Sequence, residues 1–456
     1  MKNKAISFLL AMLVSKVGFP QGDANASEPL SDADKLYGLS LYWSKVSENF
    51  VYFDQVPELN FDSAYKEYIS RVLATSNNYE YYRELMKFNA LLKDGHTNVY
   101  PPKSLSEKYV DWPSIELTEV NHSAVITGVD KALLSTIPLG SILIGVDGQD
   151  LETHLRTNVM PYIASSTNHI LWKNAVRNAL KGVPNSEVTV TVQHPSGRVE
   201  DVLLRRNSRH QSVDIVKLNL PHSNGKVLEF RWLENEIVYL ALNSFADRKI
   251  LDEFYSIYDE LKQAKGLVID LRFNGGGNSA IGSEILSSFT NANLQGSIWK
   301  TRKHISAYKA WGYKGYADYN AWQTGEMPEL IAKQDTTVVP TFVLIGRNTA
   351  SAAEDFLIYA DKLEHFTTIG GKTYGSTGQP LFFDLPGGGS FRVCAKRDSY
   401  PDGREFVGFG IHPDEAVSPT PADLILEKDV VLIQAVQKLE KALSLLISPS
   451  VPVPNA

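Results

Sequence analysis

The sequence contains one cysteine, Cys394, in 456 residues. A lone cysteine excludes an intramolecular disulfide and the paired-cysteine zinc and CxxC sites. Cys394 lies in a segment of alternating polarity, 390–396, which predicts a buried strand position rather than a nucleophile. The chain also lacks an HExxH motif and the His/Cys/Asp spacing of a zinc site. We therefore expect neither a metal nor an organic cofactor.

An excess of charge of either sign is also missing. Lysine and arginine number 45 against 52 aspartate and glutamate, which gives a net charge of −7. Nothing in this balance indicates binding to nucleic acid or to an anionic membrane. Basic and aromatic residues interleave at 299–322, a pattern that can stack on single-stranded nucleic acid or line a substrate cleft. We interpret this segment as a packed surface loop and expect no nucleic-acid partner.

Long apolar runs are absent except near the N-terminus. Two lysines precede an apolar run at 5–14, and residues 24–26 read Ala-Asn-Ala, the small-x-small pattern of a signal-peptidase site. The run is too short to span a bilayer. The pattern predicts a signal peptide at 1–26 and an exported chain, periplasmic or extracellular, with no integral membrane segment after cleavage. A short buried helix is the alternative interpretation.

The rest of the chain divides by periodicity. Apolar residues at spacings of three and four predict an N-terminal helical domain at 27–112. Short alternating strands predict a β-rich domain at 113–207 that contains a helical insertion at 151–182. From 208 to 448 strands alternate with helices, which is typical of a sheet with parallel members. The proline-rich end, 449–456, is expected to be disordered. The fold class is therefore α/β multidomain.

A candidate nucleophile, Ser351, opens a helix-like run directly after the apolar strand at 338–346. Parallel sheets bind ligands beyond the carboxyl ends of their strands. The first-turn N–H groups of a helix are unpaired there, and the helix dipole favours developing negative charge. Ser351 is thus well placed for acyl transfer, although serine is also an ordinary N-cap residue.

A glycine loop, 274–277, follows the strand at 266–272. Consecutive glycines let the backbone approach a ligand and direct N–H groups at an anion. No GK[ST] or GxGxxG motif accompanies the loop, so a phosphate site is not supported. We predict an oxyanion hole formed by the N–H groups of Gly275, Gly276 and Ala352, with a plain tight turn as the alternative.

Three segments together carry a family resemblance. Residues 266–277, 349–354 and the Gly-Phe-Gly-Ile-His-Pro-Asp run at 408–414 resemble, in order and spacing, the signature of the C-terminal processing (tail-specific) serine proteases. This resemblance implies a PDZ domain at 113–207 and a crotonase/Clp-like catalytic domain at 208–448. It also implies a polypeptide substrate, bound through its C-terminus by strand addition.

The family's general base is where this chain departs from the pattern. Members with a Ser/Lys dyad carry lysine 25 residues after the serine, and here that position is Ser376. Lys372 is the alternative base. The tricorn-like and interphotoreceptor-retinoid-binding-protein-like branches are similar at 91–97, where they place a catalytic histidine. We therefore expect His96 to be the base, because an imidazole titrates near neutrality.

The supporting groups follow from the same resemblance. Glu405 is the expected third catalytic residue, and the family's serine before the histidine is replaced by Gly95. We expect Glu354 to support the helix N-terminus and Gln379 to orient a polar group in the cleft. The sequence thus predicts an exported serine endopeptidase. The alternative is a catalytically inactive carrier of an apolar ligand or peptide, and the oligomeric state is not predicted.

Overall fold

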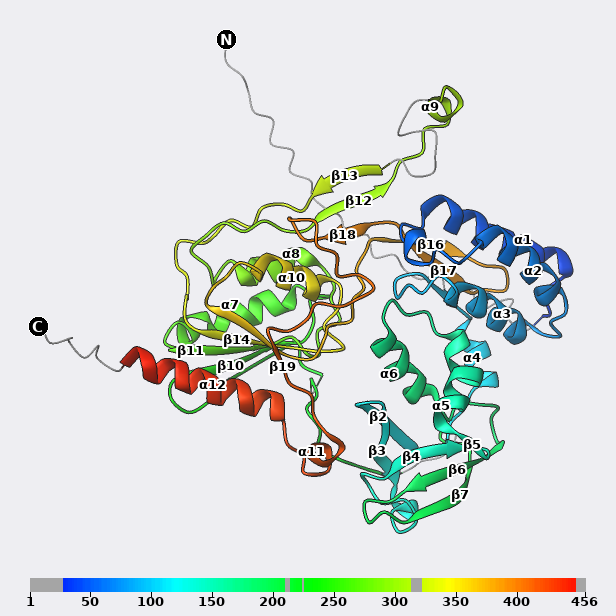
Figure 1. Ribbon diagram of the computed structural model, residues 1–456, viewed down its shortest axis with the longest axis horizontal. Coiled ribbons are helices and arrows are strands. Elements are labelled where there is room, and N and C mark those ends of the chain that lie inside the picture. Colours follow the sequence, from blue (N-terminus) through cyan, green and yellow to red (C-terminus); the bar gives the residue numbers. More distant parts are fainter. Residues whose placement is uncertain (1–27, 210–213, 224, 313–321, 448–456) are drawn as a thin grey trace, which may run out of the picture.

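The computed structural model describes residues 28–209, 214–223, 225–312 and 322–447 (Figure 1). The predicted signal peptide and the C-terminal tail at 449–456 lie outside these residues. Within them, no helix combines the length and hydropathy needed to cross a membrane. The chain forms a mixed α/β structure of several sheets and helices, and three parts are visible in Figure 1.

The first part is helical, as predicted. It contains α1 (Asp32–Asn49), a 3₁₀ turn (Phe53–Gln55), α2 (Phe61–Leu73), α3 (Asn78–Ala90) and α4 (Lys103–Tyr109). Side chains of Ser31, Asn60 and Asn77 cap the first three α-helices by accepting backbone N–H groups. The apolar stripes form a buried aromatic core, in which the rings of Phe61 and Phe88 stack at 4.8 Å.

This helical part is completed by strands from the far end of the chain. β1 (Asn98–Tyr100), β17 (Ser390–Cys394) and β16 (Pro380–Asp384) form a three-stranded sheet in that order. Tyr42 of α1 packs its ring edge-on against Phe391 at 5.2 Å, and Cys394 is fully buried, as predicted. Residues 28–112 therefore share one hydrophobic core with the C-terminal part.

The second part is a sheet with helices at one end. The strands are β2 (Ile115–Val120), β3 (Ser123–Asp130), β4 (Ile142–Val146), β5 (Gln149–Asp150), β6 (Glu187–Gln193), β7 (Val199–Arg205) and β8 (Ile215–Lys217). The main order is β2-β3-β4-β6-β7, and the sheet has its own core. The insertion is helical, as predicted: α5 (Leu151–His154), a π-turn (Leu155–Val159), a 3₁₀ turn (Met160–Tyr162) and α6 (Asn168–Asn178). Another 3₁₀ turn is Lys131–Leu133.

The third part is a six-stranded sheet in the order β19-β15-β14-β11-β10-β9. Its strands are β9 (Leu228–Trp232), β10 (Ile237–Leu242), β11 (Gly266–Asp270), β14 (Thr341–Ile345), β15 (Phe366–Gly370) and β19 (Glu415–Ala416). All neighbours are parallel except β9 and β10. The helices are α7 (Lys249–Leu261), α8 (Ser279–Leu286), α10 (Ala352–Ala360), α11 (Pro421–Ile425) and α12 (Val430–Ile447).

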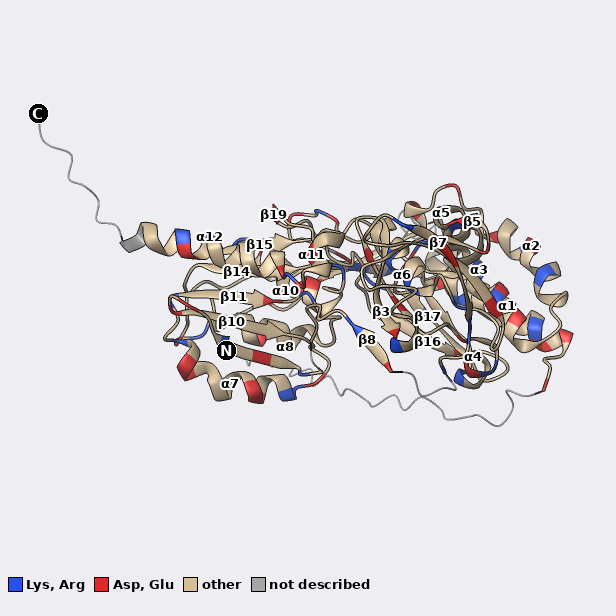
Figure 2. Cartoon of the chain, turned by 90° about the horizontal axis from the view of Figure 1, so that it is seen from below, with Lys and Arg blue, Asp and Glu red and all other residues tan. Residues whose placement is uncertain are grey.

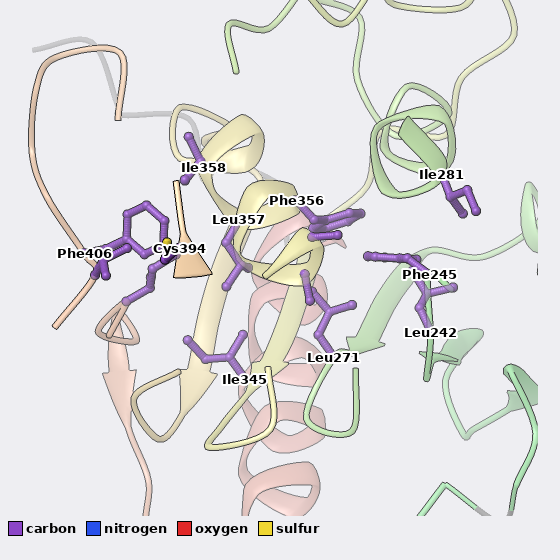
Figure 3. Packing of buried hydrophobic residues seen from close by; sticks show 14 of the residues in the cluster. Leu242, Phe245, Leu271, Ile281, Ile345, Phe356, Leu357, Ile358, Cys394 and Phe406 are labelled. Carbon is purple, nitrogen blue, oxygen red and sulfur yellow. The ribbon is translucent and has the colours of Figure 1, made fainter. Parts of the chain in front are cut away.

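Helices cover both faces of this sheet. Figure 2 shows α12 on one side and α7 and α8 on the other. The central strands β10, β11 and β14 are buried on both faces, which explains their continuous apolar sequences. Phe356 and Leu357 of α10 pack near Leu271 and Ile345 at the carboxyl ends of β11 and β14 (Figure 3). This packing fixes the start of α10 against the sheet.

The expected surface loop at 299–322 is instead a protruding hairpin where it is described. β12 (Ile298–Arg302) pairs with β13 (Trp322–Glu326) and with β18 (Arg397–Ser399), and α9 (Ser306–Ala310) follows β12. Residues 313–321 lie outside the described residues. The alternation of basic and aromatic residues is a strand pattern, because Lys300 and Arg302 share one face and both lie over Trp322.

Candidate active site

Ser351 lies at the turn between β14 and α10, and its backbone is strained. Its φ of 55° and ψ of −121° fall in a region that residues with side chains rarely adopt. Such a conformation costs on the order of 1–3 kcal/mol and concentrates at functional sites. A serine on a sharp, strained strand-to-helix turn is the nucleophile elbow of α/β-hydrolases. The turn therefore presents the half-buried Ser351 hydroxyl as a nucleophile would be presented.

The glycine loop lies directly against this turn. A Cβ atom on Gly276 would lie 2.8 Å from Ser351 Cβ and 3.0 Å from Ala352 N. Gly276 also has a φ of 98°, so both the contact and the backbone require glycine. The two segments that the sequence predicts to converge are therefore in contact.

Asn274, which sequence reasoning missed, holds this arrangement together. Its buried side chain donates to Leu242 O at 2.8 Å and accepts the Gly276 N–H at 2.9 Å. Its main-chain oxygen accepts the N–H of Ala350 at 3.0 Å. One residue thus joins β10, the glycine loop and the turn of the nucleophile. The signal was its place immediately before three glycines.

These bonds correct part of the predicted oxyanion hole. The Gly276 N–H is already bonded to the Asn274 side chain, so it is not available to a substrate. Gly275 faces open space, and in the described part of the chain its N–H has no acceptor. The N–H of Ala352, the first residue of α10, likewise has none among the described residues. Gly275 and Ala352 therefore remain as the candidate donors.

His96 lies between α3 and β1, and its Nδ1 is 2.6 Å from Ser376 Oγ. Burial lowers the pKa of His96 to about 3, and the positive charges of Arg392 and Lys396 add to this effect. The imidazole is therefore neutral at physiological pH. Within the described residues its Nε2 has no hydrogen-bond partner and so is open to accept a proton.

Ser376 is the second residue that sequence reasoning missed, although its position was noted for lacking a lysine. Gly95 explains how its hydroxyl reaches the imidazole. A Cβ on Gly95 would lie 2.9 Å from the Tyr374 ring and 3.1 Å from Ser376 Oγ. A serine at 95, as in the family pattern, would project into the place that the Ser376 side chain fills. The two departures from the pattern, glycine at 95 and serine at 376, are therefore complementary.

Glu354 connects the nucleophile to this serine. Its Oε2 accepts the N–H of Ser351 at 3.1 Å and that of Ser376 at 3.3 Å. Its Oε1 accepts the Gly375 N–H at 2.8 Å and the Thr373 hydroxyl at 2.5 Å. Burial raises the pKa of Glu354 to about 8, and the four hydrogen bonds oppose that rise. Glu354 thus bonds the N–H of the residue that begins the α10 turn, and it also anchors the loop that carries Ser376.

The Gly-Phe-Gly-Ile segment supports the same loop from its other side. The Gly408 N–H donates to Gly375 O at 3.0 Å, and the Ile411 N–H donates to Thr373 Oγ1 at 2.7 Å. Gly410 has a φ of 82°, and a Cβ there would lie 2.8 Å from Thr373 O. This family-like segment therefore has a structural role at the site.

Three predicted residues take other positions. Both carboxylate oxygens of Glu405 accept hydrogen bonds from Arg397, at 2.8 and 2.7 Å. The group bonded to the His96 imidazole is Ser376 and not Glu405. Lys372 and Gln379 have exposed side chains. Among the described residues, none of these three forms a hydrogen bond to Ser351, His96 or Ser376.

The charged residues that flank the glycine loop, Asp270 and Arg272, form structural contacts. Arg272 forms ion pairs with Asp270 at 2.6 Å and Asp429 at 2.7 Å, which fixes the strand end before the glycine loop. The described residues contain no group of three or more His, Cys, Asp or Glu side chains arranged to hold a metal ion. Ser351 and His96 share no hydrogen bond in the described structure, although catalytic hydrogen bonds are often long in free enzymes.

An alcohol on a strained turn, beside a glycine loop and a helix N-terminus, suits acyl transfer, the chemistry of serine hydrolases. Comparison with known proteins narrows this class, because residues 236–417 match the model of peptidase family S41. Over this segment, which contains Ser351 and the glycine loop, the chain is similar to the S41 peptidases, and it is a serine protease.

Solved structures with the same fold extend the similarity beyond the matched domain. Mature CPAF is 12% identical, with a TM-score of 0.71, over 92% of this chain and 99% of that one. CPAF complexed with lactacystin is 14% identical, with a TM-score of 0.70, over 91% and 98%. A putative peptidase from Parabacteroides merdae is 20% identical, with a TM-score of 0.50, over 92% and 98%. At such identities these similarities show the fold alone.

Proposed function

We propose that the protein is an exported serine endopeptidase in which Ser351 is the nucleophile and His96 is the general base. The strained backbone of Ser351, held against the glycine loop, is the observation that carries this proposal. Strain at a residue that could relax to a common conformation destabilises the fold without benefit to a carrier protein. In a peptidase the same strain places the hydroxyl beside the oxyanion donors.

The chemistry follows the order of a serine protease. Ser351 Oγ attacks the scissile carbonyl while its proton passes to His96 Nε2. Nδ1 must then carry the other ring proton and donate it to Ser376, so this hydrogen bond selects the active tautomer. The N–H groups of Gly275 and Ala352 stabilise the oxyanion. His96 returns the proton to the leaving amine, and water, activated by the same imidazole, releases the acyl group.

Ser376 is a neutral partner for the imidazole, so it stabilises the protonated ring less than a carboxylate would. An aspartate in this position would stabilise the imidazolium that forms, whereas a hydroxyl only orients the ring. The low pKa of His96, about 3, also makes it a weaker general base, because a less basic imidazole accepts a proton less readily. The base should, however, stay unprotonated far into the acid range.

Substrate capture is assigned to the second part. We propose that 113–207 is a PDZ-like domain that binds the C-terminus of an unfolded or tagged polypeptide, and that 208–448 is a crotonase/Clp-like catalytic domain. The family-like segments and the position of β2 and β7 as the outer strands of the second sheet support strand addition. A model peptide with a free C-terminal carboxylate should be cleaved faster than its amidated copy. Equal rates would contradict capture through the C-terminus.

Export rests on the charged, apolar and small-residue pattern of 1–26. The expected location is the periplasm or the medium. N-terminal sequencing of protein expressed from the full chain should begin near Ser27. Retention of residues 1–26 on the recovered protein would contradict a cleaved signal.

The decisive test is cleavage of an unfolded model polypeptide by wild type, Ser351→Ala, His96→Ala and Lys372→Ala. We expect the first two substitutions to abolish cleavage and Lys372→Ala to leave it within about twofold. Loss with Lys372→Ala and not with His96→Ala would assign the base to lysine. A fluorophosphonate probe should label wild type at Ser351, and a folded wild type that neither reacts nor cleaves would favour the carrier instead.

A further inference from the structure

The insertion of the second part reaches the loops that carry His96 and Ser376. Its residues Ser166, Thr167 and His169, at the start of α6, each form a hydrogen bond to one of these loops. The Thr167 hydroxyl donates to Tyr374 O at 3.3 Å, and His169 Nε2 donates to Thr373 O at 2.8 Å. The insertion therefore borders the active site.

Ser166 makes the contact nearest to the base. Its Oγ accepts the Gly95 N–H at 2.8 Å and donates to Asp94 Oδ1 at 3.2 Å. Asp94 is buried, and the half-buried Ser166 hydroxyl bridges the two residues that precede His96. The Gly95 carbonyl is held by the Arg392 guanidinium at 3.1 Å. Both polar groups of residue 95 are thus fixed from outside the loop.

The orientation of this loop matters for catalysis. The imidazole must keep Nδ1 on Ser376 while Nε2 faces the nucleophile, and the ring follows the backbone that carries it. A misplacement of a catalytic group by about 1 Å can cost a hundredfold in rate. Gly95 has no side chain to restrain its own backbone, so the hydrogen bond that its N–H donates to Ser166 Oγ replaces that restraint.

We propose that Ser166 is a positioning residue for His96, through which the insertion holds the catalytic base in register with Ser351. This inference rests on the proposed function, because it takes His96 as the base. The hydrogen bonds of the Ser166 hydroxyl go to Gly95 and Asp94, the two residues before His96, so it acts through the loop that carries the base. Its effect is therefore expected on turnover rather than on substrate binding.

Ser165 offers a matched control. Ser165 is buried, and among the described residues its hydroxyl donates to Thr167 O alone, at 3.0 Å and within the same segment. Ser165→Ala therefore removes a buried hydroxyl without touching the loop of His96. Ser166→Thr and Ser166→Val form a second, isosteric pair, in which threonine keeps the hydroxyl and valine removes it. This pair remains informative if Ser166→Ala folds poorly.

The experiment measures kcat and KM on an unfolded polypeptide, the rate of fluorophosphonate labelling and the thermal midpoint of each variant. We expect Ser166→Ala to lower kcat and labelling about 10- to 100-fold with KM within about twofold. Ser165→Ala should stay within about twofold in both. Ser166→Thr should keep at least tenfold more activity than Ser166→Val at similar thermal midpoints.

Equal kcat for the threonine and valine variants would overturn the inference. An equal fall in kcat for Ser166→Ala and Ser165→Ala would also overturn it, since it would show a general effect of this segment. If wild type itself neither cleaves nor reacts with the probe, the proposed function fails and this inference falls with it. If wild type is active and the Ser166 variants have the same kcat as wild type, the role of Ser166 is refuted while the proposed function stands.

Discussion

The two halves of the candidate site are built differently. The nucleophile half consists of Ser351, the glycine loop with Asn274, and Glu354, all at the carboxyl ends of two adjacent strands of one sheet. The base half consists of His96 and the groups that hold its loop. These groups come from separate segments of the chain: Ser376, Arg392 of β17 and Ser166 of the insertion.

This difference has a physical consequence. The nucleophile half is part of the buried sheet core, so its hydrogen bonds stabilise the fold as well as the site. The base half is assembled where three parts of the molecule meet, and its hydrogen bonds mainly orient one ring. Substitutions in the first half should change folding and activity together, and those in the second should change activity with little effect on folding.

Glu354→Ala should give the largest effect. It would leave four donors without an acceptor, namely three backbone N–H groups and the Thr373 hydroxyl. Each unpaired buried group costs about 1–3 kcal/mol, so we expect a loss of at least about 3 kcal/mol in the free energy of unfolding. Activity should be lost as well. Denaturant unfolding measures the first quantity, and a loss below about 1 kcal/mol would contradict the role of Glu354.

Glu354→Gln serves as the control and adds a dependence on pH. The pKa of Glu354 is about 8 in the fold against an ordinary value of 4.5, so the folded state keeps a proton that the unfolded state has released. The contribution of this proton to stability is complete below pH 4.5 and is lost as pH rises toward 8. Wild type should therefore lose more unfolding free energy between pH 5 and pH 8 than Glu354→Gln. Parallel pH curves for the two proteins would be the contrary result.

Ser376→Ala tests the base half. Removing the hydroxyl leaves Nδ1 of His96 without the partner that selects its tautomer. We expect kcat to fall about 10- to 100-fold, while the loss in the free energy of unfolding stays within the about 1–3 kcal/mol of one unpaired group, against four such groups in Glu354→Ala. Kinetics on an unfolded polypeptide and thermal unfolding give the two values. A loss of stability as large as that of Glu354→Ala would mean that the two halves do not differ as described.

A second substitution sharpens this test. Because Ser376 fills the space into which a side chain at 95 would project, Gly95→Ser should be harmful in wild type. In the Ser376→Ala background the contact with the Ser376 hydroxyl is removed, while those with the Tyr374 ring and with Cβ of residue 376 stay, and the new hydroxyl can approach the imidazole. We therefore expect Gly95→Ser to restore part of the lost kcat. Equal harm in both backgrounds would show that the two residues are not complementary.

The same division explains what the sequence could predict. Ser351, the glycine loop and Glu354 lie in short segments whose pattern is local, and the alternation of strands and helices brings those segments together. The partner of His96 depends on the pairing of β1 with β17, where Asn98 and Arg392 are joined across 294 positions. No local pattern reveals such a contact. Position 376 was noted only because a lysine was missing there.

Two other outcomes have similar physical reasons. Glu405 was expected at the base because it lies near the family-like segment at 408–414, but Arg397, eight positions earlier, forms a bidentate ion pair with it. The Gly276 N–H was expected to be free, but the Asn274 side chain folds back onto it. In both cases a side chain close in sequence forms the hydrogen bond that was expected to be free for the site. Composition and spacing do not show where that side chain points.

Ser351→Gly and Ser351→Ala compare the strain of the nucleophile half directly. Both variants should be inactive, because neither has a hydroxyl. Glycine accepts a φ of 55° without strain, whereas alanine keeps the strained Cβ. We expect the glycine variant to be more stable than the alanine variant by about 1 kcal/mol in denaturant unfolding. A more stable alanine variant would show that the turn stores no strain.

Glu405→Gln should have the smallest effect on activity and stability of these variants. The Arg397 guanidinium also pairs with Asp54 at 2.6 Å, so it keeps a carboxylate partner when Glu405 is neutralised. We expect kcat within about twofold of wild type and a loss of stability of about 1 kcal/mol or less, as for a partly exposed ion pair. A tenfold fall in kcat with unchanged stability would instead return Glu405 to the catalytic group. It would also mean that the base half rearranges when substrate binds, since Arg397 would have to release the carboxylate before it could act on His96.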